Sequence, residues 1–108
     1  LGFSLPIGIA VDTTNHRLFV GDAINNRVLV YNLAADNSLT DRTPDNVLGQ
    51  ADFTSRAAAT TQAGMSSPRG GSYDEANSRL FVADTNNNRM LVYDVTPAVG
   101  EFFLLLPY

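Results

Sequence analysis

A repeat at an offset of 62 residues constrains the fold of this 108-residue chain more than any other feature. The segment DAINNRVLVY begins at Asp22, and nearly the same text, DTNNNRMLVY, begins at Asp84. At this offset residues 5–33 align with residues 67–95, and about half of the aligned positions are identical. A repeat of this kind indicates two copies of one supersecondary unit that stack on each other.

Each copy contains short β-rich runs that are separated by polar turns. RLFVGD and RVLVYN in the first copy match RLFVAD and RMLVYD in the second copy. NVLGQ at residues 46–50 can supply a fourth strand to the first copy, and FFLLL at residues 102–106 is the only candidate for that strand in the second copy. We therefore expect four strands in each repeat and eight strands in the chain.

The strands are apolar on both faces, because alternate side chains of a strand point to opposite faces. Leu18 and Val20 take one face of their strand, whereas Phe19 takes the other. Helices would cover such a sheet in a parallel α/β fold, but the best helical stretch, residues 55–64, could make two turns at most. The sheets must therefore cover each other, as the blades of a β-propeller do.

The sequence thus predicts an all-β fold of two four-stranded antiparallel blades within a single two-blade segment, residues 1–108. We place the first blade at about residues 5–50 and the second at about residues 67–106, with a connecting rim loop at residues 51–66.

The repeated text also resembles a known family. PIGIAVD, NHRLFVGDAINNRVLVY and VLGQADF are similar to the NHL-repeat β-propeller family in its bacterial form, and PRGGSYDEANSRLFVADTNNNRMLVYDV resembles it equally well. Residues 96–108 depart from the pattern, because EFFLLLPY replaces VLGQ-like text. The resemblance implies blades of the NHL type, which most often form rings of six.

Two blades alone would each leave one apolar face uncovered, and such faces forfeit about 25 cal/mol for each Å² that stays in water. Propellers close with about four to eight blades, so two-blade chains can close as homo-oligomers through head-to-tail contacts. The six-bladed rings of the resembling family favour a trimer. The other alternative is that the chain is a piece of a longer six-bladed protein.

Composition limits the range of partners. The net charge is −4 and the seven basic residues are scattered, which disfavours nucleic acid because phosphate binding needs clustered Lys and Arg. There are no cysteines, so disulfides and thiolate metal sites are excluded. The apolar run at residues 102–106 is too short to span a bilayer. The compartment is not indicated by the sequence.

The Asp-x-x-Asn-Asn-Arg loop of each repeat is the first candidate site. From Asp84 the text D-x-N-x-N opens like a calcium loop, but Arg89 stands where such a loop needs Gly, and Ile24 breaks the pattern in the first copy. Recurrence in both repeats favours a structural role for Asp22, Arg27, Asp84 and Arg89. The neighbouring asparagines are candidate ligand-binding residues: Asn25, Asn26, Asn87 and Asn88.

His16 is the only histidine, and it lies in the turn TTNHR, with Ser78 as its counterpart in the second repeat. One histidine cannot build a three-ligand zinc site within one chain, although a symmetric oligomer could bring several histidines together. The peptidylglycine-amidating lyases, which are similar to NHL proteins, use several histidines around zinc, and those residues have no counterparts here. We therefore expect no catalytic residues, no metal and no cofactor, with His16 an ordinary turn residue.

The segment at residues 51–71 connects the two repeats on the same rim as the Asn-rich loops. Arg56, Gln62 and Arg69 give it hydrogen-bonding capacity, and the alternative is a covering loop that seals the groove between blades with Phe53 and Met65. The leading hypothesis is a non-catalytic binding or scaffold module that binds a protein, peptide or glycan on this rim. The alternative is a metal-dependent propeller enzyme, similar to lyases or lactonases, with its site on the ring axis.

Overall fold

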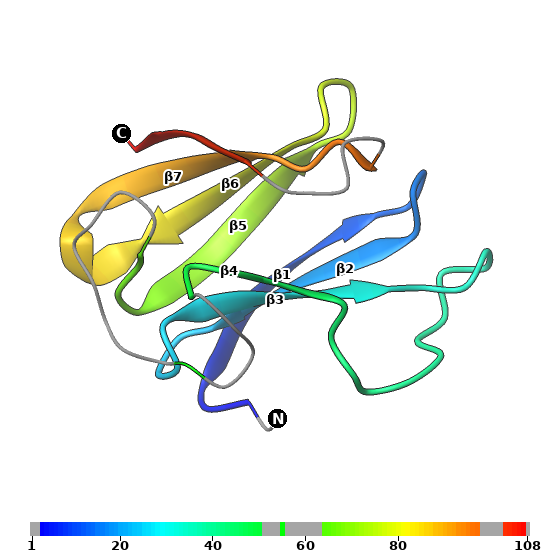
Figure 1. The fold of residues 1–108 in the computed structure, drawn as a ribbon, viewed down its shortest axis with the longest axis horizontal. Coiled ribbons are helices and arrows are strands. Elements are labelled where there is room, and N and C mark those ends of the chain that lie inside the picture. The colour runs from blue at the N-terminus through cyan, green and yellow to red at the C-terminus, as the bar shows by residue number, and fades with distance from the viewer. Residues whose placement is uncertain (1–2, 51–54, 56–63, 98–102, 108) are drawn as a thin grey trace.

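The computed structural model describes residues 3–50, 55 and 64–97 and the backbone of residues 103–107. The N-terminal sheet has the strand order β1 (Pro6–Asp12), β2 (Arg17–Asp22), β3 (Arg27–Asn32) and β4 (Asn46–Leu48). The C-terminal sheet has the order β5 (Pro68–Asp74), β6 (Arg79–Asp84), β7 (Arg89–Asp94) and β8 (Phe103–Pro107). Figure 1 shows that the two sheets meet along their first strands, β1 and β5, which lie side by side.

The prediction of an all-β fold is confirmed, because the described ranges are built from strands and contain no α-helix; the 3-10 turn η1 (Thr85–Asn87) lies between β6 and β7. All strand pairs are antiparallel. The strand expected at residues 46–50 ends earlier, at Leu48, because Gly49 adopts a left-handed φ of 87°. The strand expected at residues 102–106 is found one residue later, as β8, where Phe103 pairs with Asp94.

The repeat extends to the register and to the backbone angles. Asp22 pairs with Arg27 across β2 and β3, and Asp84 pairs with Arg89 across β6 and β7. Non-glycine residues with positive φ also occur as counterparts 62 residues apart: Leu5 and Ser67, His16 and Ser78, Asn26 and Asn88. Because positive φ is uncommon outside glycine, these shared angles indicate that both repeats fold into the same local structure.

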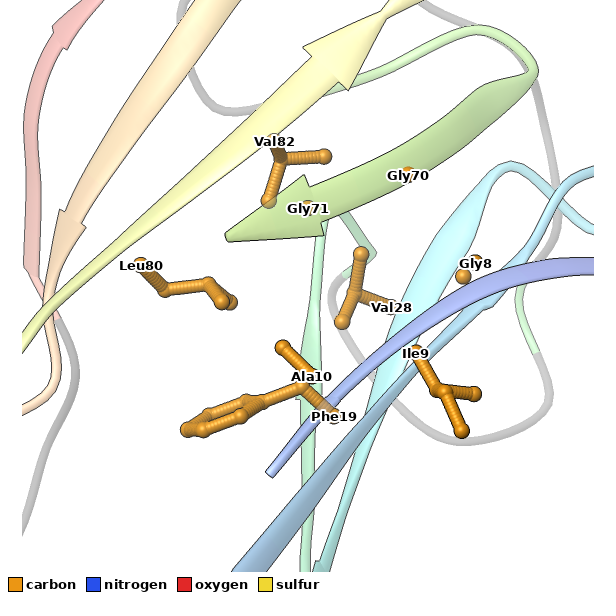
Figure 2. A pocket seen from close by; sticks show the side chains of 10 residues that line it. Gly8, Ile9, Ala10, Phe19, Val28, Gly70, Gly71, Leu80 and Val82 are labelled. Atoms are coloured by element: carbon orange, nitrogen blue, oxygen red, sulfur yellow. The ribbon is translucent and has the colours of Figure 1, made fainter. Parts of the chain in front are cut away.

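The core lies between the two sheets. Phe19, Val28 and Val30 of the N-terminal sheet form one buried cluster with Leu80 and Val82 of the C-terminal sheet. Figure 2 shows four of these side chains around the crossing of β1 and β5, namely Phe19, Val28, Leu80 and Val82. The cavity among them measures about 10 Å³, which is at the lower limit for a single water molecule. The two sheets are therefore closely packed where they meet.

Two glycines allow β1 and β5 to approach each other. Gly8 has a φ of +83°, and a Cβ atom on it would lie 2.5 Å from the Cα of Gly70. Gly8 and Gly70 are also counterparts in the repeat, 62 residues apart. A side chain at position 8 would push the sheets apart, so this contact requires glycine.

Candidate functional site

Each Asp-x-x-Asn-Asn-Arg loop is fastened by its own aspartate. Asp22 accepts hydrogen bonds from the Ser4 N–H at 2.7 Å, from Asn25 Nδ2 at 2.9 Å and from Arg27 Nε at 2.8 Å. Both side chains of the Asp22–Arg27 ion pair are almost fully buried. These contacts tie the β2–β3 hairpin to the segment that precedes β1.

The second loop repeats this arrangement. Asp84 accepts hydrogen bonds from the Ser66 N–H at 2.6 Å, from Asn87 Nδ2 at 2.9 Å and from Arg89 Nε at 2.7 Å. Both oxygens of each aspartate are thus engaged by the protein itself. These hydrogen bonds indicate a structural role for both aspartates, and they direct the side chains of Asn25 and Asn87 toward the aspartates.

The remaining two asparagines differ from each other. Asn26 Oδ1 accepts the Ser67 N–H at 2.8 Å, and the Asn26 carbonyl accepts a hydrogen bond from Gln50 Nε2 at 2.7 Å. Asn26 therefore joins the N-terminal sheet to the segment that leads into β5. Its counterpart Asn88 has a similar left-handed φ but lies exposed, directly before the first residue of β7.

Of the three rim-loop candidates, the structure describes only Arg69. Its side chain is exposed, and Arg69 Nε donates to Ser67 Oγ at 3.2 Å. Arg56 and Gln62 lie outside the described residues, as does Phe53. Met65 is fully buried in the cluster between the sheets, which is the position expected of a residue that seals the groove.

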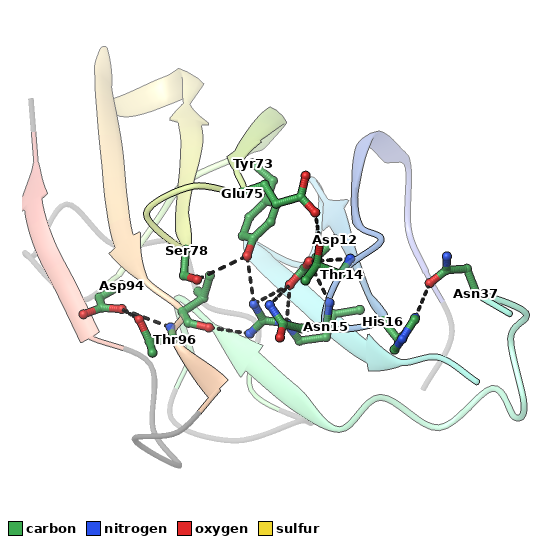
Figure 3. A network of polar contacts seen from close by, with 12 residues as sticks. Asp12, Thr14, Asn15, His16, Asn37, Tyr73, Glu75, Ser78, Asp94 and Thr96 are labelled. Atoms are coloured by element: carbon green, nitrogen blue, oxygen red, sulfur yellow. Dashed lines mark hydrogen bonds and ion pairs between the residues drawn. The ribbon is translucent and has the colours of Figure 1, made fainter. Parts of the chain in front are cut away.

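A second polar cluster joins the two sheets at the end that lies away from the Asp-x-x-Asn-Asn-Arg loops (Figure 3). Arg17 donates from Nε and Nη2 to Asp12 Oδ2, at 3.0 and 2.7 Å, and its guanidinium lies 5.3 Å from the centre of the Phe19 ring. The same guanidinium donates across the interface to the Val95 carbonyl and to the Tyr73 hydroxyl. Thr14 and Glu75 form a further side-chain contact between the sheets.

The charge balance in this cluster is reflected in the pKa of Asp12. Burial by itself would raise that pKa, but hydrogen bonds from the Asn15 backbone and from Arg17 outweigh burial and lower it below its usual value. Asp12 is consequently ionised at neutral pH and pairs with Arg17. The cluster acts as a fastening between the sheets.

The structure places His16 in the turn between β1 and β2, with a left-handed φ of 58°. Its Nδ1 atom lies 2.7 Å from Asn37 Oδ1 in an exposed contact, which Figure 3 shows at one end of the network. In the part of the chain that the structure describes, no three His, Cys, Asp or Glu side chains are grouped so that they could hold a metal ion. Within that same part, no helix is long and apolar enough to cross a membrane.

The sheets have two chemically distinct faces, which the repeat defines. The leucine face of the N-terminal sheet consists of Leu18, Val20, Leu29 and Tyr31, and its counterpart in the C-terminal sheet consists of Leu80, Val82, Leu91 and Tyr93. The phenylalanine face consists of Phe19, Val28 and Val30 in the N-terminal sheet and of Phe81, Met90 and Val92 in the C-terminal sheet.

Both outward faces are hollowed. A depression of about 550 Å³ lies on the leucine face of the N-terminal sheet, where its lining includes Phe3, Ile9 and Tyr31. A second depression, of about 640 Å³, lies on the phenylalanine face of the C-terminal sheet and is lined in part by Phe81 and Met90. Ile9, Phe3 and Met90 are exposed large apolar side chains. These faces are the candidate interaction surfaces of the molecule.

Sequence reasoning missed Phe3. Its ring centre lies 6.1 Å from that of Tyr31, at the edge of the leucine face. The signal was present, because Phe3 precedes Met65 by the 62-residue offset, but the aligned segment begins at residue 5. Phe3 and Met65 thus belong to equivalent places in the two repeats.

No family model matches the chain, and no curated protein matches it significantly. The interpretation of its function therefore rests on the repeat and on the geometry of its surfaces.

Proposed function

We propose that the chain is a pair of NHL-type β-propeller blades and acts as a non-catalytic binding or scaffold module. The observation that carries this proposal is that both antiparallel sheets have their strands in consecutive order, repeat the register of one hairpin and share one buried cluster. Stacked four-stranded sheets of consecutive strands are the building units of a propeller. The blade assignment also agrees with the resemblance of the repeated text to NHL repeats.

The state of the charged groups favours binding or scaffolding over catalysis. Asp12, Asp22 and Asp84 are fully buried and are bound by arginine and asparagine side chains. A catalytic carboxylate or a metal ligand needs an oxygen that can reach a substrate or an ion. These residues instead form structural ion pairs with arginine side chains.

In the proposed module, copies of the chain associate until the ring closes, and three copies supply the six blades most common in the resembling family. The rim that carries Asn26, Ser67 and Arg69 then binds a protein, peptide or glycan. The exposed Arg69 guanidinium and the polar groups beside it can donate hydrogen bonds to carbonyl, carboxylate or hydroxyl oxygens.

Rim binding is testable with peptide and glycan arrays. Ligands that bind the purified protein would be titrated by calorimetry against the wild type, Arg69→Ala and Thr13→Ala. Thr13 is exposed in the β1–β2 turn, at the opposite end of the sheet from the rim, and serves as the control. We expect Arg69→Ala to weaken binding at least about fivefold and Thr13→Ala to leave it unchanged.

Two outcomes would overturn the proposal. The first is equal binding by all three proteins, which would remove the rim as the site. The second is a stoichiometric, tightly held Zn²⁺ or Ca²⁺ ion in elemental analysis of the purified protein, which would favour a metal-dependent enzyme.

A further inference from the structure

The two sheets meet through different faces. The C-terminal sheet buries its leucine face against the phenylalanine face of the N-terminal sheet, so that Leu80 and Val82 contact the cluster around Phe19. The leucine face of the N-terminal sheet and the phenylalanine face of the C-terminal sheet point outward. Each outward face is therefore the repeat counterpart of a face that is already buried in the internal contact.

Two matched pairs of residues differ in exposure, whereas the strand residues Val20, Leu29 and Tyr31 of the outward leucine face are buried. Met65 is 0% exposed between the sheets, whereas its counterpart Phe3 is 44% exposed on the outward leucine face. Arg17 is 4% exposed in the internal contact, whereas its counterpart Arg79 is exposed. Both differences have the direction expected if the outward faces lack a neighbour that the inward faces have.

The glycine contact has an open counterpart as well. In the direction of its missing side chain, Gly8 meets Gly70 at 2.5 Å. In the corresponding direction from Gly70, no atom lies within 4 Å. A further sheet could approach Gly70 as closely as the C-terminal sheet approaches Gly8, with a glycine again at the crossing.

We propose that copies of this chain dock head to tail, with the phenylalanine face of one C-terminal sheet covering the leucine face of the next copy's N-terminal sheet. This inference rests on the proposed function, in which copies associate as blades. The occupant is a second copy because each chain carries one of each complementary face, in equal numbers. Such a contact is heterologous, so each copy uses two different surfaces.

The internal contact also predicts a hydrogen bond in the docked pair. Asn26 Oδ1 accepts the Ser67 N–H, and the counterparts of these residues are Asn88 and Leu5. Asn88 has a φ of 52°, close to the 54° of Asn26, and Leu5 has a φ of 56°, close to the 53° of Ser67. Asn88 of one copy should therefore accept the Leu5 N–H of the next.

Two exposed positions allow each face to be disabled separately. Ile9 is 65% exposed and lines the depression on the leucine face, and Figure 2 shows it pointing away from Leu80. Met90 is 45% exposed and lines the depression on the phenylalanine face. Ile9→Glu and Met90→Lys each bring an unpaired charge into the proposed contact, which is costly once water is excluded. Ile24→Glu is the matched control, because Ile24 is 58% exposed in the β2–β3 loop and lines neither depression.

The experiment compares the masses of these proteins by sedimentation equilibrium. We expect the wild type and Ile24→Glu to associate, and Ile9→Glu and Met90→Lys to sediment as monomers of 11.6 kDa, each with affinity reduced at least about 100-fold. Circular dichroism and thermal unfolding establish that the variants are folded. A mixture of Ile9→Glu with Met90→Lys should associate, because each chain keeps one intact face and the two intact faces are complementary.

Cross-linking traps even a weakly associated pair. It is specific for introduced cysteines, because the chain has no cysteine of its own. Asn88→Cys is placed in the Ile9→Glu chain and Leu5→Cys in the Met90→Lys chain, and a short bismaleimide is added to the mixture. The expected product joins one chain of each kind. Products that join like chains, or no product, would overturn the pairing of faces.

The outcomes separate this inference from the proposed function. If the wild type associates and Ile9→Glu or Met90→Lys associates equally well, the pairing of faces is wrong but a self-assembling scaffold stands. A folded wild type that stays monomeric at every concentration tested would overturn both.

Discussion

The buried ion pair between Asp22 and Arg27 should make a large contribution to the stability of the N-terminal sheet. Arg27 Nε lies 2.8 Å from Asp22 Oδ2, and the exposed fractions of the two side chains are 4% and 0%. Arg27→Met keeps most of the aliphatic stem but leaves the carboxylate without its counter-charge. Breaking a buried pair on one side costs about 3–5 kcal/mol.

The neighbours of Asp22 set where in this range the result should fall. The Ser4 N–H and Asn25 Nδ2 still donate to the carboxylate after the substitution. We therefore expect the lower end, a loss of about 3 kcal/mol in the free energy of unfolding. That loss is a large share of the roughly 5–15 kcal/mol that holds a domain of this size folded.

The assay is urea denaturation of Arg27→Met, Asp22→Asn and the double variant, all in the Met90→Lys background so that association does not contribute. Because Asp22→Asn removes the charge that Arg27 neutralises, the double variant should lose less stability than the sum of the single losses. We expect a coupling energy of at least about 1 kcal/mol. An additive cycle, or a loss below about 0.5 kcal/mol for Arg27→Met, would refute the reasoning.

Three further results are expected, measured in the same background. Gly8→Ala should lower the free energy of unfolding by about 2–4 kcal/mol, and Gly70→Ala by less, because a Cβ at Gly8 meets the opposite strand whereas a Cβ at Gly70 meets no atom; equal losses in urea would contradict this. The Tyr93 hydroxyl is buried with no hydrogen-bond partner in the described structure, and burial raises its pKa well above 10. Tyr93→Phe should therefore stabilise the protein by up to about 1 kcal/mol and reduce the loss of stability above pH 10, where the unfolded tyrosine ionises and the folded one does not. The lowered pKa of Asp12 predicts that stability is lost as the pH falls below the ordinary aspartate value of 3.8, which melting temperatures across the acid range would measure.

Much of the fold was predictable from the sequence because the repeat lies in the hairpins. The runs from Arg17 to Asn32 and from Arg79 to Asp94 each contain two β-rich segments and a short polar loop, which define an antiparallel pair locally. The faces that meet were not predictable, because Leu18 and Phe19 are both apolar and the alternation pattern does not rank one side over the other. That choice depends on how two whole sheets fit together.

The candidate rim residues illustrate a different limit. The sequence identifies Asn25 and Asn26 as adjacent polar residues in a loop, without distinguishing their roles. In the structure Asn25 donates a hydrogen bond to Asp22, three residues earlier in the chain. Asn26 instead adopts a left-handed φ and accepts a hydrogen bond from the Ser67 N–H. The first contact follows from local spacing, as short side chains often bond to groups a few residues away. The second depends on the packing of the two sheets.

The division between local and long-range contacts bears on how copies of the chain would assemble. Asp22 and Asp84 each bind an arginine of their own hairpin, so the contacts that hold each hairpin lie within its own sheet. The internal contact between sheets has the advantage of a connecting chain, which raises the effective concentration of one sheet around the other. A contact between copies lacks that advantage until the ring is nearly complete, when the final contact joins two ends of one assembly. Open chains should therefore be rare under the proposed docking. Sedimentation velocity across a dilution series should resolve only monomers and one closed species, and a continuous ladder of intermediate sizes would show that the ends do not meet.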